Sequence, residues 1–70
     1  MLLKDLDAVV LTTDVPTHGL RRGDVGTVVH VNSPESFDVE FVRASGRTQA
    51  LVTLGAKDVR PAGDQDLRFG

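Results

Sequence analysis

The fold of this chain is decided by a glycine-punctuated turn that leads straight into a run of valines: Gly19-Leu20-Arg21-Arg22-Gly23-Asp24-Val25-Gly26-Thr27-Val28-Val29-His30-Val31. Valine branches at Cβ and favours a pleated, half-buried surface, so the second half of the stretch predicts a long strand. The glycines mark places where the backbone needs a positive φ or a close approach to a neighbour. The stretch therefore predicts a sharp bend followed by a strand over residues 25–32.

Length and composition limit the chain to one small domain. A chain of 70 residues buries only about 60% of the surface of its unfolded state, which leaves a marginal core. It contains no cysteine, so no disulfide or thiolate metal site supports that core, and a reducing compartment suits it. No apolar run approaches the roughly 20 residues of a membrane span. We therefore expect a cytoplasmic domain with no cofactor, no metal and no membrane contact.

The charge pattern argues against nucleic acid as the main partner. The formal net charge is −2 and both signs are scattered, whereas nucleic-acid binders cluster Lys and Arg against the phosphates. The chain has three Phe and no Trp or Tyr, so the usual aromatic surface for stacking single strands is also missing.

Four further short strands are predicted around the valine-rich one, over residues 7–11, 37–42, 47–54 and 59–60. A long ordered loop with one helical turn is expected over residues 12–24, a hairpin loop over 43–46, and a tight 3₁₀ turn over 55–58 that Asp58 caps. The polar residues 62–70 are expected to form a flexible tail.

The apolar pattern also predicts how the strands pair. Placing Val31 opposite Phe37 sets Val29 opposite Val39 and His30 opposite Asp38. Placing Val42 opposite Arg47 sets Phe41 opposite Thr48, Val39 opposite Ala50 and Phe37 opposite Val52. Both pairings turn one set of side chains inward, namely Val29, Val31, Phe37, Val39, Phe41, Ala50 and Val52. A slip by one residue would turn the whole set outward, so the register is strongly specified.

These elements predict an all-β fold: a small five-stranded SH3-like barrel over residues 1–61, with a long first loop and a 3₁₀ turn before the last strand, followed by the tail. A closed barrel leaves no long unpaired strand edge. Helices are excluded because glycine or proline interrupts every longer window and the apolar residues alternate with period two.

Three segments resemble the bacterial family known as domain of unknown function 4926: His18-Gly19-Leu20-Arg21-Arg22-Gly23-Asp24-Val25-Gly26-Thr27-Val28-Val29, Val39-Glu40-Phe41-Val42 and Leu54-Gly55-Ala56-Lys57-Asp58-Val59-Arg60-Pro61. The likeness spans residues 7–61 and implies an SH3-like barrel and a bacterial origin. It implies no activity, ligand or catalytic residue. A weaker likeness, confined to Gly-Asp-Val-Gly-Thr-Val, links the chain to RNA-binding KOW segments, but any barrel of this shape favours that pattern.

The predicted outer face of the sheet is the main candidate site. It would carry Val28, His30, Asp38, Glu40, Val42, Arg47, Gln49 and Leu51. Exposed apolar residues such as Val42 and Leu51 mark a partner or dimer surface in one interpretation. In the other they are covered by a terminal segment or are scattered surface residues, and His30 with Asp38 is an ordinary cross-strand pair.

The remaining candidates are weaker. Arg21 and Arg22 would hold a phosphate or carboxylate through their guanidinium groups, or they are solvated loop residues. His18 has no second ligand at metal spacing. The serines lie in turns without a base beside them. The segment Asp66-Leu67-Arg68-Phe69 either docks on a partner or is disordered.

The sequence thus favours a non-catalytic protein-interaction module, with another protein or a second copy of itself as the partner. A partner or neutraliser of a neighbouring gene product would fit this class. The alternative is a KOW-like RNA- or DNA-binding barrel, and an enzyme is not expected.

Overall fold

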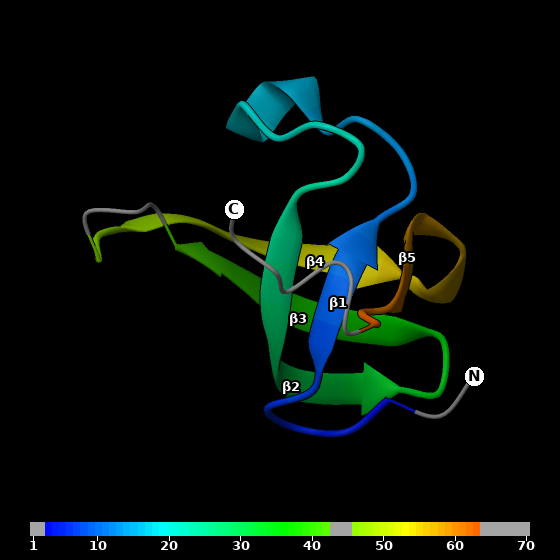
Figure 1. The fold of residues 1–70 in the computed structure, drawn as a ribbon. Coiled ribbons are helices and arrows are strands. Elements are labelled where there is room, and N and C mark those ends of the chain that lie inside the picture. The colour runs from blue at the N-terminus through cyan, green and yellow to red at the C-terminus, as the bar shows by residue number, and fades with distance from the viewer. Residues whose placement is uncertain (1–2, 43–45, 64–70) are drawn as a thin grey trace.

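The computed structural model describes residues 3–42 and 46–63, which form a single antiparallel sheet of five strands (Figure 1). Residues 43–45 of the predicted hairpin loop (43–46) and residues 64–70 of the predicted tail (62–70), including Asp66-Leu67-Arg68-Phe69, lie outside the described residues. The elements in chain order are β1 (Ala8–Leu11), the 3₁₀ turn η1 (Pro16–His18), β2 (Val25–Ser33), β3 (Ser36–Val42), β4 (Thr48–Gly55), the 3₁₀ turn η2 (Ala56–Asp58) and β5 (Val59–Pro61). The all-β prediction is confirmed.

The strand order is β4-β3-β2-β1-β5, so β2 stands at the centre. The first residues of β2 pair with β1, and its later residues pair with β3. In Figure 1 the β3–β4 hairpin crosses behind β1 and β2, so the two halves of the sheet face one another across the core. The sheet is curved like an SH3-like fold but is not closed as a barrel, because β4 and β5 are its two ends.

Gly26 explains how β2 curves over β3. A Cβ at this position would lie 2.6 Å from Val39 Cγ1 and 2.7 Å from Phe41 Cε1. Only glycine lets the β2 backbone approach these buried side chains so closely. The glycine that the sequence marks as a bend is therefore a packing contact.

The core is built from side chains of all five strands and from one residue of the β1–β2 loop, Leu20. The buried apolar residues are Val9, Val10, Leu11, Leu20, Val28, Phe37, Val39, Phe41, Val52, Leu54 and Val59. The inward prediction for Phe37, Val39, Phe41 and Val52 is confirmed, and Val31 and Ala50 pack against this core from partly buried positions.

The β2–β3 register is partly as predicted. Val31 faces Phe37 and His30 faces Asp38, as expected, but Val28 rather than Val29 faces Val39. A register shift between Val28 and His30 leaves Val29 as the extra residue of a β-bulge. The inward prediction for Val29 is therefore wrong, and its side chain is 39% exposed.

From Phe37 to Phe41, the β3–β4 register differs from the prediction by two residues. Phe41 faces Ala50 instead of Thr48, and Phe37 faces Leu54 instead of Val52. Successive side chains of a strand alternate between faces, so a shift of two keeps the side chains of residues 50–54 on their predicted faces. Ala50 and Val52 still point inward, and Leu54 joins them. This ladder also has a register shift, between Phe41 and Val42, which makes Gln49 the extra residue and pairs Val42 with Thr48 instead of Arg47.

The connections follow the prediction closely. The β1–β2 loop contains one 3₁₀ turn, and Gly19 and Gly23 adopt positive φ values of 68° and 95°. At the second 3₁₀ turn, an oxygen of the Asp58 carboxylate accepts a hydrogen bond from the Gly55 amide at 3.1 Å, so the predicted cap is confirmed.

Candidate functional site

The outer face of the β2–β3–β4 sheet carries two rows of side chains that cross all three strands. One row joins Thr27, Glu40 and Leu51, and the other joins His30, Asp38 and Thr53. These six residues are called the outer face below. None of them is buried, and together they combine two carboxylates, two hydroxyls, an imidazole and one large apolar side chain.

Asp38 accepts two side-chain hydrogen bonds on the outer face. Its Oδ1 accepts hydrogen bonds from Thr53 Oγ1 at 2.7 Å and from Asn32 Nδ2 at 2.9 Å. The bond from Thr53, then the bond from Asn32 and, as the smallest contribution, the nearby His30 lower the pKa of Asp38 below its usual value, while desolvation opposes them. Asp38 is therefore an anion held in a fixed orientation at neutral pH.

Thr53 and Asn32 are residues of the candidate site that the sequence prediction missed. With the predicted register, Asp38 would face Leu51, so nothing pointed to Thr53 as its partner. The pairing of Asp38 with Thr53 follows from the actual register. A search for a hydroxyl two residues along β4 from Leu51 would have found it.

Leu51 is the apolar centre of the outer face. It faces Glu40 on β3 and is 60% exposed. Val42, at the end of β3, is 50% exposed and faces Thr48. Both side chains are thus exposed as predicted.

Val28 and Gln49 do not belong to the outer face, and both corrections have the same cause. The bulge after Val28 turns this side chain into the core, where it is fully buried. The bulge at Gln49 turns its amide toward the β1–β2 loop, where Nε2 donates to the Gly19 carbonyl at 3.2 Å. A bulge redirects the side chains around it, and alternation along the sequence does not reveal it.

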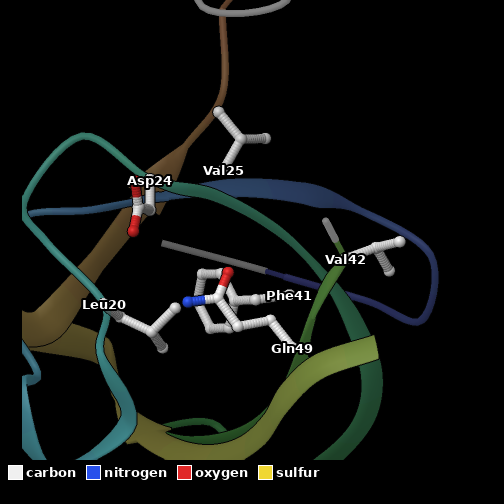
Figure 2. Close-up of a pocket in the computed structure, with 6 residues that line it drawn as sticks. All are labelled: Leu20, Asp24, Val25, Phe41, Val42 and Gln49. Atoms are coloured by element: carbon white, nitrogen blue, oxygen red, sulfur yellow. The ribbon is translucent and has the colours of Figure 1, made fainter. Parts of the chain in front are cut away.

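Gln49 forms one wall of a small notch of about 170 Å³ between the β1–β2 loop and the ends of β2 and β3. Leu20, Asp24, Val25, Phe41 and Val42 complete its lining. Figure 2 shows Gln49 reaching in front of the Phe41 ring toward Leu20, with Asp24 and Val25 above. Gln49 is bound to Gly19, and the Asp24 carboxylate accepts from the Arg21 amide at 2.9 Å. The polar side chains that line the notch, Gln49 and Asp24, thus form hydrogen bonds with the β1–β2 loop.

Arg21 and Arg22 lie on the exposed surface of the β1–β2 loop. A hollow of about 330 Å³ is lined by Asp14, Pro16, Gly19, Leu20 and Arg21. The Arg22 amide donates a hydrogen bond to Asp14 Oδ1 at 2.8 Å, and the Arg21 amide donates one to Asp24 Oδ2. The loop's own carboxylates thus accept hydrogen bonds from both of these backbone amides.

A search of residues 3–42 and 46–63 finds no group of three His, Asp or Glu side chains close enough to hold a metal ion. The same part of the chain has no helix of the length and apolarity needed to cross a membrane. The hydroxyl of Ser33 accepts from the Glu35 amide at 3.2 Å and closes the β2–β3 turn. Its geometry is that of a turn residue.

Comparison with known families places the chain. The family described as domain of unknown function (DUF4926) matches residues 5–61, from just before β1 to the end of β5. The chain belongs to the DUF4926 family. The resemblance stated from the sequence is therefore confirmed, and the DUF4926 match includes the outer face and the whole β1–β2 loop. No curated protein and no solved structure matches the chain.

Proposed function

We propose that this DUF4926 chain is a non-catalytic protein-interaction module that binds a partner protein through its outer face. One observation carries the proposal: Leu51 is 60% exposed between two carboxylates, Glu40 opposite it and Asp38 on the neighbouring row. An exposed apolar side chain with oriented polar groups around it is the usual composition of a protein-binding surface.

The chemistry of the outer face describes the partner. Glu40 and Asp38 are acceptors, so the partner should offer Lys, Arg or backbone N–H groups to them. Leu51 would pack against an apolar side chain and lose its contact with water. A basic segment with an apolar anchor fits both requirements.

The test combines capture with mapping. Proteins retained by the immobilised chain from an extract of its native host are identified, and each is then purified and titrated against the isotope-labelled chain. We expect amide NMR shifts to concentrate at residues 38, 40, 51 and 53. Glu40→Lys should reduce the affinity by at least about tenfold, because a repulsive contact replaces an attractive one.

Arg22→Ala is the matched control, since it also changes one exposed charge but lies on the loop. It should leave the affinity within about twofold of wild type. The proposal fails if no purified partner shifts the outer-face amides. It also fails if mixed-sequence RNA binds instead, with an affinity that falls steeply between about 50 and 200 mM salt, as a KOW-like barrel would show.

A further inference from the structure

The two edges of the sheet differ in how they are protected. β5 is three residues long, Val59–Pro61, and carries both an arginine and a proline. Charged side chains and proline are the devices that keep an edge strand from pairing with another strand. β4 is the opposite edge, eight residues long, with the sequence Thr-Gln-Ala-Leu-Val-Thr-Leu-Gly, which contains neither.

The hydrogen-bond pattern identifies which groups of β4 face outward. The Ala56 amide donates to the Glu35 carbonyl at 3.0 Å, so this pair bonds across the β3–β4 hairpin. In an antiparallel ladder, bonded and non-bonded pairs alternate. Applied to the β3–β4 register, this alternation makes the backbones of Leu54, Val52 and Ala50 bond to β3. The N–H and C=O groups of Leu51 and Thr53 therefore point away from β3. The hydrogen bond of the Gly55 amide is consistent with this alternation, because the amide donates to Asp58 rather than to β3.

The free part of the edge is short and well defined. The Asp58 carboxylate occupies the Gly55 amide, and the bulge displaces the backbone at Gln49. The outward N–H and C=O groups of Leu51 and Thr53 remain, and no strand of the described segments lies beyond them.

We propose that β4 pairs antiparallel with β4 of a second copy of this chain, with Leu51 of each copy opposite Thr53 of the other. This register bonds every outward group of both residues and places the two Val52 residues opposite each other at the two-fold axis. A register centred on Leu51 would use the bulged backbone at Gln49, and one centred on Thr53 would need the Gly55 amide that Asp58 already binds.

Charge favours a second copy as the occupant. In a two-fold pairing a strand meets its own sequence, so any charge on it would meet a like charge. β4 has none. The carboxylates of Asp38 and Glu40 lie on β3, and the two β3 strands would be three strand spacings apart, or roughly 14 Å. That exceeds the Debye length of about 8 Å at physiological salt, so they repel weakly.

The dimer extends the proposed function, since the two outer faces would become one continuous surface, but it does not depend on the partner. Interfaces of this small size are weak, so we expect a dissociation constant on the order of 100 µM. Sedimentation equilibrium from about 10 µM to 1 mM should show a monomer–dimer equilibrium. Leu51→Lys should weaken it by at least about tenfold, since lysine protects edge strands.

Glu40→Lys is the matched control, because it also places a lysine on the outer face but one strand away from the edge. It should leave dimerisation within about twofold of wild type while reducing partner affinity by at least about tenfold, so either proposal can fail without the other. Thr53→Pro, which removes an outward N–H, provides a second edge variant and should also weaken the dimer.

Amide hydrogen exchange provides the decisive measurement. We expect the Leu51 and Thr53 amides to become protected as concentration rises, while the Ala50 and Val52 amides are protected at every concentration. The proposal is overturned if the chain stays monomeric to about 1 mM, or if it dimerises without protecting Leu51 and Thr53. Protection of these amides that does not change with concentration would also refute it, because the edge would then be occupied within one chain.

Discussion

Substituting Gly26 with alanine tests the contact that lets β2 cross the core. The added Cβ would lie 2.6 Å from Val39 Cγ1 and 2.7 and 2.9 Å from two carbons of the Phe41 ring. Val39 is fully buried and Phe41 is 2% exposed, so neither side chain has free space to move into. The substitution must therefore displace packed core atoms.

The magnitude follows from two opposing effects. Overpacking of a buried site costs about 1–3 kcal/mol. Alanine returns about 0.4–1 kcal/mol by restricting the unfolded chain. We therefore expect Gly26→Ala to lower the free energy of unfolding by about 1–2 kcal/mol. At roughly 4–8 °C per kcal/mol for a small domain, Tm should fall by about 4–16 °C.

Urea and thermal unfolding followed by far-UV circular dichroism measure this loss. Gly23→Ala is the matched control: its φ is +95° and nothing lies within 4 Å of a Cβ there, so it loses stability through backbone strain alone. Val39→Ala removes the nearest clashing atom, so it should rescue part of the Gly26→Ala loss, with a coupling energy of at least about 0.5 kcal/mol. It should not rescue Gly23→Ala. A Gly26→Ala protein as stable as wild type, or equal coupling of both glycine variants to Val39→Ala, would refute the packing argument.

Three further predictions follow from burial and hydrogen bonding. The folded pKa of Asp38 is below its unfolded value, so its contribution to stability is complete above about pH 4 and is lost as pH falls through the folded value. In urea titrations at successive pH values, Asp38→Asn should reduce the fall in stability at acidic pH. An unchanged fall would contradict this prediction. Val28→Ala should cost about 2 kcal/mol because the side chain is fully buried, whereas Leu51→Ala should stay within about 0.5 kcal/mol; urea midpoints decide, and similar losses would mean that the bulge is misplaced. Gln49→Ala removes the hydrogen bond to the Gly19 carbonyl and should lower the free energy of unfolding by about 0.5–1.5 kcal/mol. It should also speed amide hydrogen exchange in the β1–β2 loop. Unchanged exchange there would show that this bond does not stabilise the loop.

Most of the fold could be predicted because it depends on local patterns. Alternation over residues 37–42 separates Phe37 and Val39 from Asp38 without any knowledge of the neighbouring strand. The 3₁₀ turn and its Asp58 cap follow from a short stretch of sequence in the same way. Even the two-residue error between β3 and β4 left the faces of residues 50–54 correct, since side-chain direction repeats every two residues.

The candidate site was harder to predict because it depends on irregularities in the strands. A β-bulge adds one residue to one strand only, and it forms where packing against the partner strand and the core favours it. Alternation placed Val28 outside and Val29 inside, and the bulge between β2 and β3 reversed both. A bulge likewise removed Gln49 from the outer face, and its side chain donates a hydrogen bond to the β1–β2 loop instead.

The sequence by itself determined an all-β chain of five short strands, the residues that bend it and the exposure of Leu51. The tertiary structure alone decided which residues meet across the strands, namely Thr53 with Asp38 and Gly26 with Phe41. It also decided that the uncharged strand β4 lies at an edge of the sheet. The physical reason is that side-chain alternation is a property of each strand, whereas register, bulges and strand order depend on the packing of all five strands around one core.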